Sequence, residues 1–187
     1  MVPTLCRTLG VKGHRPVVGT WDCKHLLYVF ASLNVTSCAL HTETVESRTG
    51  LYRHTGESKT RRLQRAFAAH LRRLGQRYPK EKHPRVVVLI DNAPWHAGAP
   101  IKQALADHPH LELKRLPSYS PQLNVIERFW KVLRRRATHN RLFDTLADLK
   151  RSLRASLSYF QTVRQRLKTL IAKRYPRPVN QTALPGP

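Results

Sequence analysis

The chain has 187 residues, of which 41% are hydrophobic, so it is long enough for one domain with a buried core. No apolar run approaches about 18 residues and the first residues show no signal-peptide pattern, so we expect neither a membrane span nor secretion. Thirty-four Lys and Arg residues against eleven Asp and Glu residues give a formal net charge of +23, which favours a polyanionic partner, most simply nucleic acid.

The first predicted elements are two strands and a helix. Residues 26–33 read LLYVFASL, an apolar and aromatic run typical of a strand. A turn signal at residues 34–37 separates it from residues 39–45, which alternate apolar and polar side chains as a half-buried strand does. A tight turn between consecutive strands makes them antiparallel. Residues 60–78 then predict an amphipathic helix with Ser58 as its N-cap.

The next strand is the most apolar stretch of the chain. Residues 86–90 read VVVLI, and a short β-branched run of this kind indicates a strand buried on both faces. The run ends at Asp91, and the carboxyl end of such a strand is where open α/β sheets usually carry their chemistry. A helix near residues 100–107 and a strand at residues 111–116 follow.

A further helix follows this strand, with Ser120 as a plausible N-cap and Pro121 as its first residue. Its predicted buried stripe consists of Leu123, Ile126, Trp130 and Leu133. Asn124, Glu127 and Lys131 share the neighbouring face, which can point along the sheet edge toward Asp91. Beyond it, Asp144 is a candidate cap for another helix, and the helical pattern continues from Tyr159 to Ala172.

Asp91 and Glu127 are therefore candidate partners at one site. Two carboxylates brought together repel each other, and a divalent cation removes that repulsion. Hard oxygen ligands select Mg²⁺ or Mn²⁺. Two such ions, about 4 Å apart, would activate a water and stabilise the leaving oxygen of a phosphodiester.

The stretches DNAPWH (residues 91–96) and LPSYSPQLNVIERFW (residues 116–130) carry a family resemblance. Together they resemble the second half of the DDE domain of mariner-type transposases, and more narrowly the bacterial insertion-sequence family six-thirty. The resemblance covers roughly residues 2–159. It implies that Asp91 and Glu127 are the second and third catalytic acids and metal ligands. It also implies supporting roles for Asn92, His96 and Asn124. For His96, contact with a substrate phosphate and organisation of the loop both stay open.

The resemblance implies an α/β fold: a ribonuclease H-like mixed sheet with flanking helices and additional C-terminal helices. That fold begins with three meandering strands, and only two are convincing here. In the family, the first strand carries the first acid and is followed by a pattern that this chain matches with Pro3, Leu5, Arg7, Gly10, Gly13 and Pro16. We therefore expect an N-terminally truncated chain without that strand and acid. Asp22 is the alternative source of the acid, although the family has a turn residue at its position.

The expected organisation is a catalytic domain over residues 1–137, basic C-terminal helices over 138–173 and a disordered, proline-rich tail over 174–187. Candidate DNA-binding residues are Arg128, Lys131, Arg134, Arg135 and Arg136. The arginine triplet fits a solvated helix end as well as it fits contact with the DNA backbone.

The predicted function is that of a transposase fragment. The full-length family enzyme performs metal-dependent DNA cleavage and strand transfer, acts on transposon ends and target DNA, and can work as a homodimer. This chain alone would have an incomplete site. The alternative is a non-catalytic nucleic-acid-binding protein that keeps the fold; a junction resolvase is disfavoured by the helix PQLNVIERFW. Three cysteines without metal or redox spacing suit a reducing cytoplasm, and DNA binding would place the protein at the nucleoid.

Overall fold

The computed structural model describes residues 26–47, 57–118, 120 and 123–172, together with the single residues 12, 14 and 17. The proline and glycine pattern of residues 3–16, Asp22 and the tail from residue 174 onward lie outside the described residues. None of the described helices combines the length and the apolarity that crossing a bilayer requires.

The first ladder is an antiparallel hairpin. β1 (Leu26–Leu33) pairs with β2 (Leu40–Ser47), with Leu33 opposite Leu40 and Leu26 opposite Ser47. Asn34 closes the turn, because its side-chain oxygen accepts hydrogen bonds from the backbone N–H groups of Thr36 and Ser37 at 2.9 and 2.8 Å. The two predicted strands and their antiparallel pairing are confirmed.

The second ladder is parallel and is separate from the first. β3 (Val86–Ile90) pairs with β4 (Leu111–Arg115), with Val86 beside Leu111 and Ile90 beside Arg115. The crossover between them holds the 3₁₀ turn η1 (Pro94–His96) and α3 (Ala99–Asp107). This strand–helix–strand order follows the prediction.

The helix α2 (Lys59–Arg77) joins the two ladders through one hydrophobic core. Ser58 caps it by accepting a hydrogen bond from the N–H of Arg61 at 3.2 Å, as predicted. Its apolar face packs with Phe30 of β1, Ile90 of β3, and Ile101 and Ala104 of α3. The residues that α2 contributes to this core are Leu63, Phe67, Ala68, Leu71 and Leu74. Gly75 permits a close approach to α3, since a Cβ there would lie 2.3 Å from the ring of His108.

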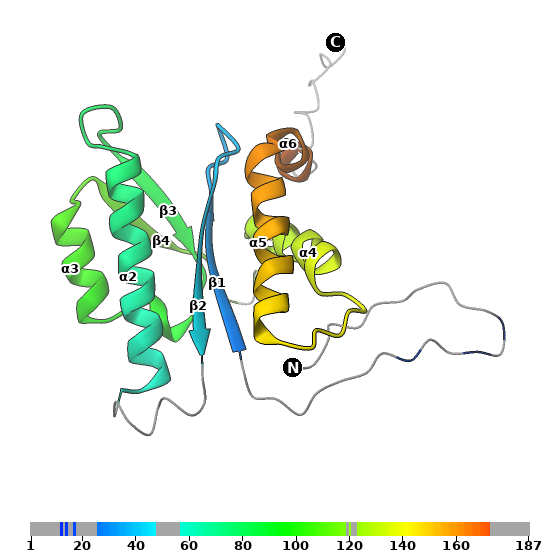
Figure 1. The fold of residues 1–187 in the computed structure, drawn as a ribbon. Coiled ribbons are helices and arrows are strands. Elements are labelled where there is room, and N and C mark those ends of the chain that lie inside the picture. The colour runs from blue at the N-terminus through cyan, green and yellow to red at the C-terminus, as the bar shows by residue number, and fades with distance from the viewer. Residues whose placement is uncertain are drawn as a thin grey trace, which may run out of the picture.

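The C-terminal helices form the other core. α4 (Ile126–Ala137), α5 (Leu146–Thr162) and α6 (Arg164–Ala172) pack around Phe129, which is fully buried. Leu27, Val29, Ala31 and Leu33 of β1 pack against this core, whereas Tyr28 and Phe30 face α2. The β1–β2 hairpin therefore lies between α2 on one side and the helices α4 to α6 on the other, as Figure 1 shows.

Several local predictions were wrong. The helix predicted from Pro121 begins at Ile126, so Leu123 precedes it and is 48% exposed instead of buried. The buried side chains of α4 are Phe129, Leu133 and Ala137. Thr145, not Asp144, caps α5 by accepting from the N–H of Asp148. The continuous helix expected up to Ala172 is divided at Val163 into α5 and α6.

The prediction that β3 is buried on both faces was also wrong. Val86, Val88 and Ile90 are at least partly buried, but Val87 and Leu89 are 45% and 58% exposed. The alternation follows from the strand period of two, with one face on the α2 core and the other face open.

Candidate active site

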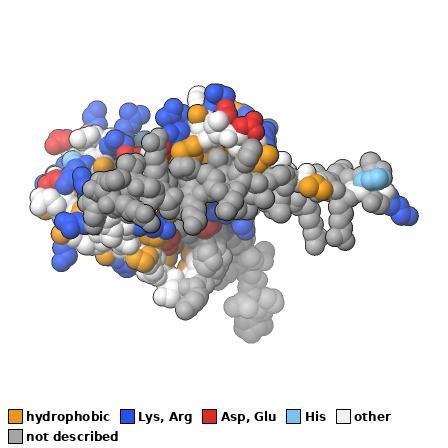
Figure 2. Space-filling view, turned by 60° about the horizontal axis from the view of Figure 1, so that its bottom comes forward, with side chains coloured by type: hydrophobic (Ala, Val, Ile, Leu, Met, Phe, Trp, Pro, Cys, Tyr) orange, Lys and Arg blue, Asp and Glu red, His pale blue; other side chains and the backbone are white. Residues whose placement is uncertain are grey.

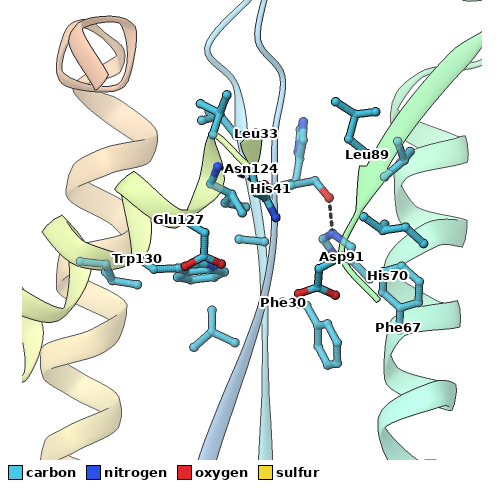
Figure 3. A pocket seen from close by; sticks show the side chains of 18 of the residues that line it. Phe30, Leu33, His41, Phe67, His70, Leu89, Asp91, Asn124, Glu127 and Trp130 are labelled. Atoms are coloured by element: carbon cyan, nitrogen blue, oxygen red, sulfur yellow. Dashed lines mark hydrogen bonds between the residues drawn. The ribbon is translucent and has the colours of Figure 1, made fainter. Parts of the chain in front are cut away.

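A cavity of about 1020 Å³ lies between the two ladders and the start of α4. Residues of β1, β3 and α4 line it, and both Asp91 and Glu127 are among them. Figure 3 shows the two carboxylates projecting into this cavity from opposite sides, Asp91 from the end of β3 and Glu127 from α4. The fold thus brings together two acids that are 36 positions apart in the sequence.

Asp91 is held by its own loop. Its Oδ1 accepts a hydrogen bond from the N–H of Ala93 at 3.0 Å and lies 2.9 Å from Nδ1 of His96. The first contact is an Asx turn, which the Asp-Asn start of the loop favours. The side chain stays 56% exposed, so the carboxylate is positioned and still accessible from the cavity.

His96 positions Asp91. Its Nδ1 faces two acceptors, the carboxylate of Asp91 and the carbonyl oxygen of the same residue at 3.4 Å, so Nδ1 carries the proton. The ring packs on Phe67, with centroids 4.3 Å apart. Burial lowers the pKa of His96, although its contacts with Asp91 act in the opposite direction. The contact with Asp91 is one by which His96 can organise the loop.

Glu127 lies in the first turn of α4, and Asn124 fixes that turn. The side-chain oxygen of Asn124 accepts from the N–H of Ile126 at 3.3 Å, and its carbonyl accepts from the N–H of Glu127 at 3.1 Å. These contacts form a turn ahead of the helix; α4 itself begins after Val125 without a side-chain cap, and Ser120 does not cap it. A carboxylate in the first turn is also favoured by the positive end of the helix dipole.

Asn92 ties the loop after β3 to the end of β4. Its amide donates to the carbonyl oxygen of Leu116 at 3.1 Å, and Arg115 approaches its side-chain oxygen at 3.5 Å. Arg115 also lies 3.5 Å from the carbonyl oxygen of His96. Arg115 was not among the predicted site residues, because only the parallel register, which places it beside Ile90, brings it to this loop.

The five predicted DNA-binding residues lie on α4 but differ in their surroundings. Arg128 donates to the carbonyl oxygen of Leu170 in α6 at 3.0 Å, and the guanidinium of Arg136 lies over the ring of Tyr159 at 3.9 Å. These two contacts help to hold the C-terminal helices together. Lys131, Arg134 and Arg135 are exposed. On the face shown in Figure 2, Lys and Arg side chains outnumber Asp and Glu.

Two acids do not make a complete cation site. Within the described ranges, no group of three or more His, Cys, Asp or Glu side chains is arranged to hold a metal ion. Asp91 and Glu127 supply hard oxygen donors to one cavity, which suits Mg²⁺ or Mn²⁺. A third His, Cys, Asp or Glu ligand for these two acids would come from outside the described part of the chain.

Residues 44–150 match the family described as DDE superfamily endonuclease, a span that includes Asp91 and Glu127. A curated relative, the uncharacterized protein y4pE/y4sA of Sinorhizobium fredii (strain NBRC 101917 / NGR234), is 31% identical over 84 residues, which are 45% of this chain and 58% of the relative.

Two solved structures share the fold over 91% of this chain. The Mos1 transposase paired-end complex with left transposon end has a TM-score of 0.54 at 16% identity, and the Mos1 mariner paired end complex with Mn has a TM-score of 0.52 at 17% identity. They confirm the predicted ribonuclease H-like α/β fold. The chain spans 51% of each Mos1 chain, and so about half the length of these structural relatives.

Proposed function

Because the chain belongs to the DDE superfamily of endonucleases, we propose that it is the catalytic portion of a mariner-type transposase of the insertion-sequence family six-thirty. The observation that carries this proposal is the cavity that receives both Asp91 and Glu127. The complete enzyme would cut DNA at transposon ends and join them to target DNA. It would act as a homodimer in the cytoplasm, at the nucleoid.

The proposed cofactor is Mg²⁺ or Mn²⁺, held by Asp91 and Glu127 and by a third acid from outside the described residues. When bound, the ions would supply a nucleophilic water and charge stabilisation at the leaving oxygen. The contribution of the chain itself is positional. His96 and the N–H of Ala93 orient Asp91, and Asn124 fixes the turn that presents Glu127. The Mos1 mariner paired end complex with Mn supports this choice of metal.

Removing either acid is expected to weaken Mn²⁺ binding. We predict that Asp91→Asn and Glu127→Gln each lower the affinity at least about tenfold, and that His96→Ala lowers it less, by releasing Asp91. Titration of free Mn²⁺ by electron paramagnetic resonance measures this directly. Glu81→Gln is the matched control, because it removes one exposed carboxylate at the amino end of β3, away from the cavity. Unchanged affinity in both acid variants would contradict the shared site.

The proposed partner is DNA, which the net charge of +23 and the Mos1 complex with a transposon end both support. We predict binding to duplex DNA that falls by about 10³-fold or more between 50 and 200 mM salt, if six or more phosphates are contacted. Replacing Lys131, Arg134 and Arg135 together by alanine should reduce the slope of log affinity against log salt by about 0.9 per lost contact.

Fluorescence anisotropy with a labelled duplex measures this slope. The control variant replaces Lys80, Lys82 and Lys102, which are equally exposed but lie at the amino end of β3 and on α3. If the control lowers the slope as much as the α4 variant does, DNA does not bind preferentially along α4.

The alternative function is a non-catalytic nucleic-acid binder with the same fold. The charge and the pair of acids without a third partner among the described residues favour it. The two functions differ in one measurement: in a catalytic portion the effect of Mn²⁺ on DNA binding should differ between the unmodified chain and Asp91→Asn, whereas in a simple binder Mn²⁺ should weaken both equally by competing for phosphates. Robust Mn²⁺-dependent cleavage by this chain alone would show that its site is already complete.

A further inference from the structure

The helix α2 carries an excess of positive charge that works against its own stability. Its 19 residues include seven Lys and Arg and no Asp or Glu. Three of these cations, Lys59, Arg61 and Arg62, lie in the first turn, at the positive end of the helix dipole, where a cation is unfavourable. Arg61 and Arg65 are four positions apart, a spacing at which like charges repel each other. Helix formation alone therefore does not account for this pattern.

Acids near α2 balance only part of this charge. The ion pairs that join α2 arginines to acids among the described residues are Arg65–Glu57 at 3.2 Å, Arg72–Asp107 at 2.8 Å and Arg73–Glu43 at 2.6 Å. These three acids are fewer than the seven cations of the helix. Only Nε of Arg72 donates to Asp107, which leaves its two terminal nitrogens for another acceptor. The charge of α2 therefore suits an anionic partner.

A groove of about 550 Å³ lies between α2 and α3, which run side by side. Its lining includes Arg61 and Arg72, the amides Gln64 and Gln103 and the hydroxyl residues Ser58 and Thr60, and it contains no Asp or Glu of the described part of the chain. The two arginines are three helical turns apart, so they lie on one side of α2 with an axial separation of about 16 Å.

This α2–α3 groove begins next to the loop that carries Asp91. Gln64, which lines the groove, donates to the carbonyl oxygen of Ala97 at 2.6 Å, and Ala97 directly follows η1. A single phosphate ion is too small to contact both arginines at this separation. A DNA strand offers one phosphate for about every 3.4 Å of helix axis, so its backbone can contact both. The forked guanidinium groups match the geometry of phosphate oxygens.

We propose that the α2–α3 groove binds the phosphodiester backbone of duplex DNA through Arg61 and Arg72, as a second contact surface in addition to α4. The helices α2 and α4 lie on opposite sides of the β1–β2 hairpin, as Figure 1 shows. A duplex that contacts both would be held on either side of the cavity that receives Asp91 and Glu127. This inference takes DNA as the polyanion from the proposed function and adds the surface that binds it.

The test compares variants that remove the same charge from opposite ends of α2. Arg61→Gln and Thr60→Glu change the groove, whereas Arg77→Gln and Gln76→Glu are the matched controls at exposed positions outside it. Fluorescence anisotropy with a labelled duplex of about 20 base pairs gives the slope of log affinity against log salt. We expect each groove variant to reduce this slope by about 0.9, the value of one lost phosphate contact, and the controls to keep the slope of the unmodified chain.

Urea unfolding separates a role in DNA binding from a role in folding. Thr60→Glu places an acid in the first turn of α2 and Arg61→Gln removes a cation from it, so the helix dipole favours both changes. The urea midpoint should therefore stay the same or rise in both variants while DNA binding weakens. A lower midpoint in both variants would assign these positions to folding and overturn the proposal.

Three binding results would also overturn it. The first is an unchanged slope in both groove variants while the variant of Lys131, Arg134 and Arg135 has a reduced slope, which would leave the proposed function intact. The second is an equal reduction in the groove variants and their matched controls, which would indicate a general effect of net charge. The third is no DNA binding by the unmodified chain, which would contradict the proposed partner as well.

Discussion

Replacing Phe129 by alanine is expected to lower the free energy of unfolding by about 3–5 kcal/mol, a large share of the stability of a domain this size. Phe129 has no exposed surface and stands at the centre of the core formed by α4, α5 and α6. Its ring contacts Phe160 edge-to-face at 5.5 Å and Trp130 at 5.2 Å. Truncation would leave a cavity and remove both aromatic contacts.

The substitution of Phe129 should also affect the candidate active site, because Glu127 lies on the same helix, two residues before Phe129. A loosened α4 should present Glu127 less uniformly, so Mn²⁺ affinity should fall together with stability. Urea unfolding followed by circular dichroism measures the stability change. The matched control is Leu123→Ala, an equally apolar truncation at a position that is 48% exposed, which should cost less than about 1 kcal/mol. Equal losses in both variants would show that this core does not anchor the helix.

Acid is expected to destabilise the fold through His70. This side chain is only 4% exposed, lies in α2, and is within 2.8 Å of the hydroxyl of Ser32 in β1 through Nε2. Burial lowers its pKa from 6.5 to about 4, with further lowering by the charges of His41 and Arg73. Glu43 is 4.0 Å from the ring, too far for a hydrogen bond, and it pairs with Arg73 at 2.6 Å.

The direction in which stability changes with pH follows from proton linkage. Between pH 6.5 and about 4 the unfolded chain binds a proton at His70 that the folded chain does not, so stability falls as the pH falls through this range. Above pH 6.5 the ring of His70 is neutral in both the folded and the unfolded chain, so its full contribution to the free energy of unfolding is present. The total loss below pH 4 is about 3 kcal/mol, and about 2 kcal/mol of it should appear between pH 7.5 and pH 5.

Urea unfolding at pH 7.5 and pH 5 tests this expectation in the unmodified chain and in His70→Gln. Glutamine keeps a hydrogen-bonding side chain but does not titrate, so the stability loss on acidification should be smaller by about 2 kcal/mol in the variant. Other titrating groups, including His41, contribute equally to both proteins. The same loss in both would mean that His70 is not the group that senses acid.

Much of the fold could be predicted from residue patterns, because the determinants are local. The apolar runs at residues 26–33 and 86–90, the Ser58 cap and the arginine-rich outer face of α2 act over a few neighbouring residues. Their period and their polar ends therefore predict the elements without knowledge of the rest of the chain. The Asp-Asn turn and the family motifs likewise indicate Asp91 and Glu127 as the candidate acids.

The errors occurred where long-range packing decides between local alternatives. Ser120 and Pro121 predict an early start of the helix, but α4 begins at Ile126, after Val125, without a side-chain cap. Arg115 reaches the loop of the site through strand register alone. These choices depend on contacts between residues far apart in the sequence, which no local pattern encodes.

The amino-acid sequence alone determined the presence of the helices but not all of their ends, most strand positions, the excess of positive charge and the two candidate acids, since each depends on side-chain chemistry and short-range periodicity. Only the tertiary structure decided that these acids enter one cavity and that β3 leaves a face open. A run such as VVVLI indicates that its side chains prefer to be buried, but it does not indicate which element covers them. The covering element depends on how the two ladders are arranged in the folded chain.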